Sequence, residues 1–386
     1  MVKAIGIDPG TKSMDVFGFD DVTGEILIDE PIPRDEVTKK PDVVLDAIKK
    51  TEKKYGKIDA IIGPSGYGLP LVRASKATDS DIKEATFITQ KDVERRLKIV
   101  GLRELMFLMK ESKDLNVWFG PGVVHLPTVP EYRKANKIDM GAADKVFSAV
   151  LGIKDQAEFY DIDYSETSFI LLEIGFGYTA AMGIEKGKIV DGIGGTTGGI
   201  GYMGMGAMDG ELAYALANTI EFSKLDLFKG GAVSISGLDF RKTSIERFIE
   251  LSKTSERVER AYEAFMESVI KDTYALLPSV KKPREILLSG RFTRIDAFVK
   301  DLKPRLENHL SNLGITAKIR NLQSKAKNVK EAAEGASIMA NGIANGKYSK
   351  LIDITELKKS SGSIFDHIHL EKKVINGIKD KFTKNC

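Results

Sequence analysis

An acid-bearing turn near the start of the chain is repeated, in layout, near its middle. The apolar run Val2–Ile7 leads into Asp8-Pro9-Gly10-Thr11-Lys12-Ser13, and another apolar run and a second turn follow. The run Phe169–Leu172 leads in the same way into Glu173, Gly175, Gly177 and Thr179. Strand, acid, glycine and hydroxyl therefore recur in one order. This repetition predicts a fold built from two similar antiparallel meanders.

The residue types of the first turn suit a phosphate ligand. Gly10 lets the backbone approach a ligand closely, and the hydroxyls of Thr11 and Ser13 can face phosphate oxygens. Lys12 could contact a phosphate as a point charge or simply be solvated. Asp8 could hold a hydrated Mg2+ that bridges the phosphates. An ordinary hairpin turn is the alternative for this turn taken alone.

Five motifs in a fixed order resemble those of one superfamily. Asp8-x-Gly10-Thr11-x-Ser13 resembles the first phosphate loop of the acetate and sugar kinases, chaperone ATPases and actin (ASKHA), and Glu173-x-Gly175-x-Gly177-x-Thr179 resembles the second. Asp139–Lys145 resembles the first connecting helix and Ile286–Arg291 the adenosine strand and turn. Ala332–Ala336 resembles the second connecting helix, whose small residues permit close packing against the first. The resemblance covers most of residues 1–346.

Within this superfamily the layout is most similar to the butyrate kinases, and in particular to an uncharacterised archaeal family of predicted butyrate kinases. Ile61–Gly68, a strand that ends in a glycine-rich loop, and Gly187–Asp191 resemble that branch. The chain also departs from the carboxylate kinases. They carry His where this chain has Glu173, a second Gly where it has Arg291, and an Arg within the segment that corresponds to Gly177–Glu211, where this chain has none.

The resemblance implies an α/β protein with a duplicated ribonuclease-H-like fold, as in the actin-like ATPases, with a nucleotide cleft between two domains. The length of 386 residues also suggests two domains. We expect a first domain at residues 1–145 and a second at 146–345 that carries nucleotide-binding elements. Residues 346–386 are expected to form a helical tail that packs on the first domain.

The function implied is that of an ATP-dependent phosphotransferase, a small-molecule kinase, whose acceptor could be a short carboxylic acid such as butyrate. ATP and Mg2+ are the expected cofactors, with Asp8 near the metal and with Glu173 or Asp144 orienting or deprotonating the acceptor. The adenosine is expected near Ser289, Gly290 and Arg291. The phosphates are expected to contact Gly10, Thr11, Lys12, Ser13, Gly175, Gly177, Tyr178 and Thr179.

Two glycine-rich loops are the candidates for acceptor recognition. Arg73, which follows the first loop, could pair with an anionic acceptor. A flexible connection is the alternative for the second loop, and the exposed face of a helix is the alternative for Asp144. The predicted acceptor residues are Ser65, Gly66, Tyr67, Gly68, Arg73, Gly194, Gly195, Thr196 and Thr197.

Two other functions remain open on the sequence. An ATP-hydrolysing conformational switch would use the same motifs to move a protein partner. The activators of this kind need a cysteine-ligated iron–sulfur cluster, which the single cysteine, Cys386, does not supply. A degenerate nucleotide-binding sensor is suggested by the missing Arg.

Charge, apolar runs and cysteine count bear on the partners and the location of the protein. The net charge of +3, from 58 basic and 55 acidic side chains, gives no electrostatic case for nucleic-acid binding. The chain contains no apolar run near the length of a membrane span and no signal-like first segment, so we expect a cytoplasmic protein. One cysteine excludes an intrachain disulfide. We expect a small-molecule acceptor as the partner, and we allow for a homodimer.

Overall fold

The computed structural model describes residues 1–95 and 97–384, which form two compact units. Of the described residues, the first unit comprises 1–95, 97–167, 186–189 and 323–384, and the second comprises 168–185 and 190–322. Cys386 lies outside the described residues. These limits differ from the predicted boundaries at 145 and 345, because both connecting helices lie in the first unit. The three predicted domains stay a prediction.

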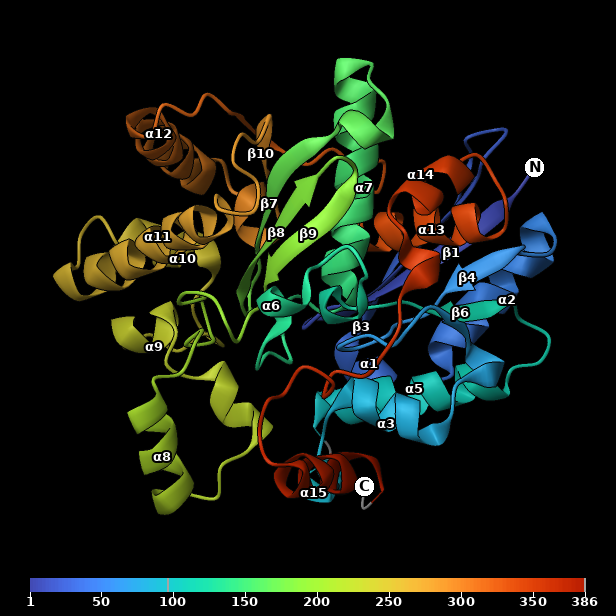
Figure 1. Cartoon of the computed structure of the whole chain (residues 1–386), viewed down its shortest axis with the longest axis horizontal. Coiled ribbons are helices and arrows are strands. Elements are labelled where there is room, and N and C mark those ends of the chain that lie inside the picture. Colours follow the sequence, from blue (N-terminus) through green and yellow to red (C-terminus); the bar gives the residue numbers. More distant parts are fainter. Residues whose placement is uncertain (96, 385–386) are drawn as a thin grey trace. The chain divides into compact units, whose positions relative to one another are not determined.

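The first unit contains a six-stranded sheet in the order β3-β2-β1-β4-β6-β5 (Figure 1). The first three strands form an antiparallel meander, and β4 and β6 run parallel to β1. The short strand β5 pairs antiparallel with β6 at the edge. The strands are β1 (Lys3–Pro9), β2 (Ser13–Asp20), β3 (Ile26–Pro33), β4 (Ala60–Ile62), β5 (Val72–Arg73) and β6 (Val117–Phe119).

The second unit contains a five-stranded sheet in the order β11-β10-β7-β8-β9. Its meander begins with the antiparallel pair β7 and β8, and β10 and β11 run parallel to β7. The strands are β7 (Ser168–Ile174), β8 (Thr179–Glu185), β9 (Lys188–Ile193), β10 (Glu285–Ser289) and β11 (Lys318–Asn321). Both sheets therefore extend a three-stranded meander with parallel strands beside its first strand. The predicted duplication of the fold is confirmed.

Helices cover both faces of the first sheet. Side chains alternate between the two faces along β1, so Ile5 and Ile7 pack with Val44 and Leu105 on one face, while Gly6 and Asp8 lie on the other. The helices of this unit are α1 (Arg34–Lys39), α2 (Val43–Tyr55), α3 (Asp79–Thr86), α4 (Gln90–Glu94), α5 (Lys98–Glu111), α6 (Glu131–Lys134), α7 (Ala143–Tyr160), α13 (Glu331–Ile343), α14 (Ser349–Ile354) and α15 (Lys372–Thr383).

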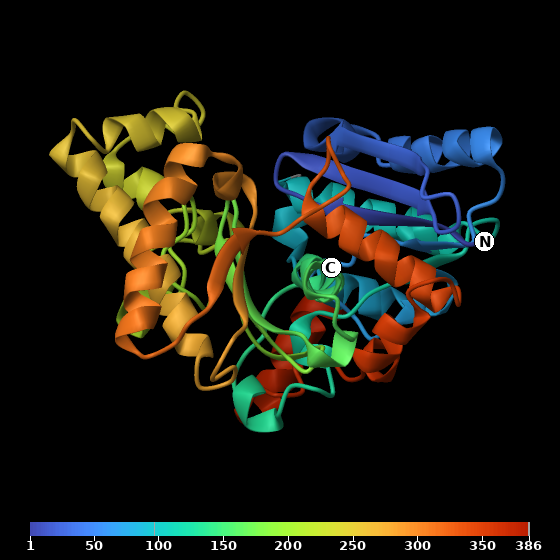
Figure 2. The same ribbon diagram turned by 90° about the horizontal axis from the view of Figure 1, so that it is seen from above.

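The helix α13 packs directly on β1 and on α7, and it lies beside β1 in Figure 2. A Cβ atom on Gly6 would lie 2.2 Å from the backbone nitrogen of Ser337, and one on Gly335 would lie 1.9 Å from the carbonyl oxygen of Phe147. Only glycine fits at both positions. The predicted close packing of the two connecting helices is confirmed, and it fixes the start of α13 beside the end of β1.

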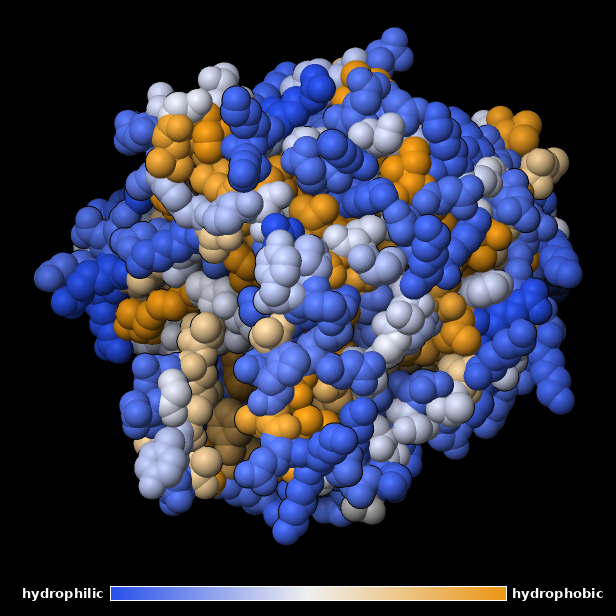
Figure 3. Space-filling view, in the orientation of Figure 1, coloured by the Kyte–Doolittle hydropathy of each residue, from blue (hydrophilic) through white to orange (hydrophobic). Residues whose placement is uncertain are grey.

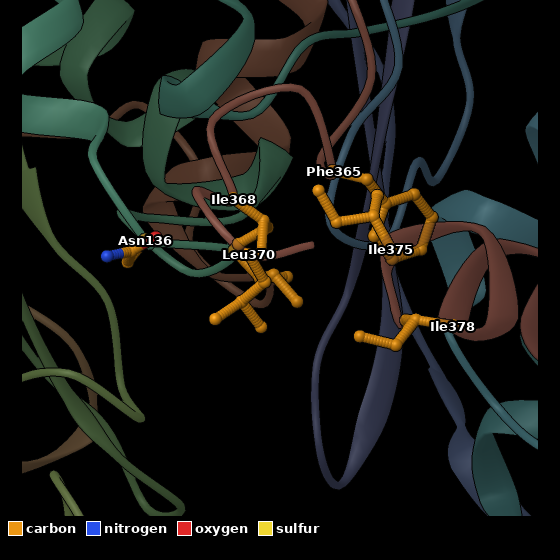
Figure 4. A pocket seen from close by; sticks show the side chains of 7 residues that line it. Asn136, Phe365, Ile368, Leu370, Ile375 and Ile378 are labelled. Atoms are coloured by element: carbon orange, nitrogen blue, oxygen red, sulfur yellow. The ribbon is translucent and has the colours of Figure 1, made fainter. Parts of the chain in front are cut away.

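The C-terminal segment packs on the first unit. Ile364 and Phe365 are buried against Val124, and the ring of Phe382 stacks on Phe87 with centroids 4.1 Å apart. Beside these contacts lies an apolar pocket of about 420 Å3, whose wall Figure 4 shows. The pocket is lined by Asn136, Ile138, Phe365, Ile368, Leu370, Ile375 and Ile378.

The second unit has a large apolar core. The helix α11 places Phe265 and Val269 in this core against Ile170 and Leu172 of β7. In contrast, α8 buries none of its side chains, and Figure 3 shows apolar side chains over the region that α8 occupies in Figure 1. The helices are α8 (Gly210–Thr219), α9 (Ala232–Ser236), α10 (Ile245–Leu251), α11 (Glu256–Leu276) and α12 (Asp296–Asn312). Among the described residues of both units, no helix is long and apolar enough to cross a lipid bilayer.

Candidate active site

Asp8 and Asp15 form a pair of buried acids on the face of the first sheet that α13 covers. They lie directly opposite each other in the register of β1 and β2, so their side chains point to the same face. Both are buried, and one oxygen of each, Oδ1, has no hydrogen-bond partner among the described residues. Two adjacent buried carboxylates repel each other and lose their hydration, so this pair requires a nearby positive charge.

Lys330, immediately before α13, supplies that charge. Its ammonium group contacts Oδ2 of Asp8 and lies 4.0 Å from Oδ2 of Asp15. Its main-chain nitrogen donates a hydrogen bond of 3.1 Å to the same oxygen of Asp15. The start of α13 also directs the positive end of the helix dipole toward these acids. One residue therefore stabilises both carboxylates.

Burial raises the pKa of Asp8 to about 7, even though the charge of Lys330 acts in the opposite direction. The neighbouring carboxylates Asp144 and Asp15 raise it further. A carboxyl group with such a pKa gains or loses its proton near neutral pH, which is unusual for an aspartate and frequent at functional sites.

Three more charged side chains complete the surroundings of Asp8. Asp144, at the start of α7, accepts a hydrogen bond of 2.7 Å from Lys145. Burial opposes the ionisation of Asp144, but Lys145 and Lys330 together lower its pKa. Burial lowers the pKa of the Arg34 guanidinium to about 10, while the charge of Asp8 counteracts that shift. We call this group the Asp8 cluster: Asp8, Asp15, Arg34, Asp144, Lys145 and Lys330.

The first predicted phosphate loop borders the Asp8 cluster. The amide of Gly10 donates to the carbonyl of Asp8 at 3.1 Å, and a Cβ atom on Gly10 would lie 2.6 Å from Nζ of Lys330. Thr11 and Lys12 are exposed, and Ser13 is half-buried. The side chain of Lys330 thus passes close over the loop, and the lack of a side chain at Gly10 leaves room for it.

The first predicted acceptor loop packs against the start of α7. The carbonyl of Gly66 accepts a hydrogen bond of 3.1 Å from the amide of Ala143, next to Asp144. Gly68 has a φ of +95°, and a Cβ atom there would lie 1.9 Å from the nitrogen of Gly122. Ser65 is fully buried, and its hydroxyl accepts from the amide of Gly120 at 2.9 Å. The loop is therefore held rigidly, and Tyr67 at its tip is only half-buried.

The structure does not bring Arg73 to these residues. Arg73 pairs with Trp118 across β5 and β6, and its guanidinium lies 5.6 Å from the Trp118 ring centroid. The pocket beside it is also lined by Lys57 and Asn116, which precede β4 and β6. Because β5 runs antiparallel to β6, it carries Arg73 toward the amino ends of the parallel strands, whereas Asp8 lies near the carboxyl end of β1.

In the second unit, Glu173 occupies the position that Asp8 occupies in the first. Each is the sixth residue of a seven-residue strand, β7 or β1, and a glycine-bearing turn follows. Glu173 is half-buried and lies beside Ser289 of β10 in the register. Gly290 follows with a φ of +97°, and a Cβ atom there would lie 2.5 Å from the carbonyl oxygen of Ile174. The predicted adenosine turn thus packs against the end of β7, and Arg291 is half-buried at its exit.

The second phosphate loop and the second acceptor loop pack on each other. The amides of Met203 and Gly204 donate to the carbonyl of Gly177, at 3.2 and 2.9 Å. A Cβ atom on Gly195 would lie 2.5 Å from the Cβ atom of Tyr178. The amide of Gly175 donates to the carbonyl of Tyr178 at 3.0 Å, which closes the turn. Residues 194–206 are therefore packed, and a slack connection does not describe them.

Two polar side chains in this region are buried. The hydroxyl of Thr179, which was predicted to meet a phosphate, is fully buried without a hydrogen-bond partner among the described residues, because Thr179 begins β8 beneath the loop. Asp272 of α11 accepts a hydrogen bond of 2.9 Å from the amide of Gly199, and burial raises its pKa to about 6. Thr197 donates to the carbonyl of Gly194 at 3.3 Å, and Thr196 beside it is half-buried.

Comparison with known proteins identifies the family. The family described as "Protein of unknown function (DUF1464)" matches residues 6–370. The chain belongs to this family. None of the curated proteins matches it.

Solved structures share the fold of this DUF1464 protein at low sequence identity. A propionate kinase from Francisella tularensis is 14% identical with a TM-score of 0.60, over 87% of this chain and 99% of that kinase. Acetate kinases from Porphyromonas gingivalis (16%, TM-score 0.55, 87% and 98%) and Entamoeba histolytica (14%, TM-score 0.57, 84% and 96%) are also similar. The predicted duplicated, actin-like α/β fold class is confirmed.

The Mg2+ site predicted at Asp8 stays a prediction, and the structure of this DUF1464 protein shows a lysine in contact with that acid. The Oδ1 atoms of Asp8 and Asp15 could each accept a metal bond, but the ammonium of Lys330 already lies on Oδ2 of Asp8. Across residues 1–95 and 97–384, no group of three or more His, Cys, Asp or Glu side chains is arranged to hold a metal ion. A positive charge is therefore present at Asp8 as a lysine.

Four residues of these regions are not predicted from the sequence: Asp15, Arg34, Asp272 and Lys330. Asp15 carried a local signal, since an acid within the apolar strand β2 alternates onto the face of Asp8. Asp272 lies within the apolar pattern of α11. The other two residues reach the Asp8 cluster only through contacts distant in sequence. Lys330 is 322 positions from Asp8, and no local pattern indicates that pairing.

Proposed function

We propose that this protein is an ATP-dependent phosphotransferase that acts on a small-molecule acceptor. The fold that it shares with proteins named as acetate and propionate kinases supports the proposal. Mg2+ enters the proposal only as the counterion that accompanies ATP.

The observation that carries the proposal is the matched position of Asp8 and Glu173. Each acid lies one residue before the end of the first strand of a meander, and each is followed by a turn with exposed or half-buried polar groups. Phosphoryl transfer depends on positioning and on compensation of phosphate charge rather than on covalent chemistry. Paired turns of this kind supply backbone N–H groups and charges at two fixed places.

We assign the nucleotide to the loops around Glu173. The phosphates are assigned to the turn that contains Gly177 and Tyr178, and the adenosine is assigned to the turn at Gly290, where the close approach to Ile174 excludes a side chain. Asp8 and its cluster are assigned to the transferable phosphate and the acceptor. Their positive charges, Lys145 and Lys330, compensate the charge of a phosphoryl group.

The cationic side chains of the Asp8 cluster can pair with an anionic acceptor, and a short carboxylic acid such as butyrate is the candidate. A carboxylate is ionised at neutral pH, so it needs cationic partners and no general base. Lys145 lowers the pKa of Asp144, so Asp144 stays ionised and is a weak base. As an ionised carboxylate it positions the ammonium group of Lys145. Glu173 is then the acid that orients the acceptor, or that deprotonates it where the acceptor is an alcohol.

A turnover assay tests the proposal. ATP turnover is measured alone and with a panel of short carboxylic acids and polyols, and binding of ATP is measured by calorimetry. Turnover stimulated by one acceptor class supports the kinase. Absence of ATP binding at millimolar concentration would refute it.

The switch and the sensor are distinguished in the same assay. Slow turnover that no acceptor changes would indicate an ATP-hydrolysing switch. Binding of ATP without any turnover would indicate a nucleotide sensor, the alternative that the lack of an Arg between Gly177 and Glu211 favours.

A further inference from the structure

We infer that the ammonium group of Lys330 is the cation that Asp8 presents to the phosphate, in place of a metal ion bound directly by Asp8. The part of this inference that concerns phosphate rests on the proposed function. The part that concerns the metal does not, because it follows from the contacts of the protein alone.

Two buried acids hold Lys330 at both of its ends. Its ammonium contacts Asp8 and lies 4.0 Å from Asp15, and its main-chain nitrogen donates to Asp15 at 3.1 Å. A lysine side chain normally samples many rotamers in water, so anchoring at both ends gives it a fixed direction. The acids are buried, whereas 20% of the Lys330 side chain remains exposed. A ligand can therefore contact the side chain of Lys330 directly, whereas the side chain of Asp8 is closed to it.

The fixed direction brings Lys330 over the first phosphate loop. A Cβ atom on Gly10 would lie 2.6 Å from Nζ and 2.8 Å from Cε of Lys330. The start of α13, which adds the positive end of a helix dipole, lies at the same place. A lysine acts as a point charge toward phosphate, so its ammonium needs only proximity and not a fixed bidentate geometry.

The same contacts oppose a metal ion at Asp8. A divalent cation on either Asp8 oxygen would lie within a few ångströms of the Lys330 ammonium, and like charges at that distance repel strongly when they are shielded from water. Arg34 is buried nearby and interacts electrostatically with Asp8, which adds a second positive charge. Asp15, the other carboxylate with an unpaired oxygen, also faces Lys330. The metal would have to displace the lysine to bind.

A titration with Mn2+ alone, followed by electron paramagnetic resonance, tests the metal part without any nucleotide. We expect the wild type and Asp8→Asn to bind Mn2+ equally weakly. Lys330→Met should bind Mn2+ at least roughly tenfold more tightly than the wild type, because one repelling charge is removed. Adding Asp8→Asn to Lys330→Met should abolish this new Mn2+ site. Lys330→Arg, which keeps the charge, and Lys327→Met, an exposed neighbour, should gain no site.

Wild-type Mn2+ binding that Asp8→Asn abolishes would overturn the inference, and so would a folded Lys330→Met protein without a new site. If Lys330→Met fails to fold because Asp8 loses its partner, the comparison of wild type with Asp8→Asn decides by itself. Equal binding supports the inference, and a loss in Asp8→Asn contradicts it.

Calorimetry with ATP in the presence of EDTA tests the phosphate part. We expect Lys330→Met to weaken ATP binding roughly 10- to 100-fold, the range for one lost charge-assisted hydrogen bond, while Lys330→Arg and Lys327→Met stay within a few-fold of the wild type. Wild-type affinity in Lys330→Met would refute this part. Binding of ATP by the wild type only when Mg2+ is present would also refute this part. Failure of the wild type to bind ATP with Mg2+ present would refute the proposed function and leave the Mn2+ result standing, so the two failures are distinguishable.

Discussion

Acidification to pH 4.5 is expected to destabilise this protein through one buried histidine, His125. The residue ends a short 3-10 helix (Val123–His125), its side chain is 2% exposed, and neither ring nitrogen has a hydrogen-bond partner among the described residues. Burial lowers the pKa of its imidazole from 6.5 to about 4, because the charged form loses its hydration. The histidine is therefore neutral in the folded protein over most of the acid range.

The size of the effect follows from the difference between the two pKa values. Below pH 6.5 the unfolded chain binds a proton that the folded protein does not bind until pH 4, so protons favour the unfolded state. The stability is fully present above pH 6.5 and is lost as the pH falls toward 4. At about 1.4 kcal/mol per pKa unit, the loss between pH 7.5 and pH 4.5 is about 2.5 kcal/mol. That is a large share of a typical stability of about 5–15 kcal/mol.

Urea unfolding of the wild type and of His125→Phe at the two pH values measures this term. Phenylalanine is apolar and similar in shape, so it keeps the packing and removes the titration. The free energy of unfolding should fall by about 2.5 kcal/mol more in the wild type than in His125→Phe. The comparison cancels buried acids such as Asp8 and Asp272, since they titrate in both proteins. The exposed His369, replaced by Phe, is the matched control and should behave as the wild type.

Parallel pH profiles of the wild type and His125→Phe would refute the reasoning. They would mean that His125 accepts a proton in the folded protein as readily as in the unfolded chain. In that case the burial of its ring would carry no electrostatic cost.

Three further predictions follow from other residues. Glu173→Gln should keep ATP affinity within a few-fold and lower turnover by roughly two to four orders of magnitude in a steady-state assay; unchanged turnover would remove Glu173 from the catalytic residues. Asp272→Asn should stabilise the protein increasingly as pH rises from 4 to 7, by up to about 3 kcal/mol, because the folded pKa of about 6 exceeds the unfolded value; urea unfolding without such a trend would contradict it. Gly68→Ala should destabilise the protein by more than about 2 kcal/mol, because φ is +95° and the new Cβ would lie 1.9 Å from Gly122, whereas an unchanged melting temperature would show that the loop relaxes.

Much of the fold was predictable because it rests on local pattern. The repeated order of strand, acid, glycine and hydroxyl predicted two meanders, and the structure places Asp8 and Glu173 at the same position of β1 and β7. The small residues of Ala332–Ala336 predicted a closely packed helix, and Gly335 meets α7 at its backbone. These features depend on periodicity and on residue size, which neighbouring residues in the chain express directly.

The charge arrangement of the site was decided only by the tertiary structure. The sequence by itself determined that an acid would end β1 beside a glycine turn, and it predicted a hydrated Mg2+ as the partner of that acid. Packing of α13 along β1 brought Lys330 to Asp8, and the antiparallel course of β5 carried Arg73 away from it. Both outcomes depend on how whole helices and strands pack and pair in the folded unit. A contact across 322 positions arises from packing of whole elements, and no local pattern of residues encodes it.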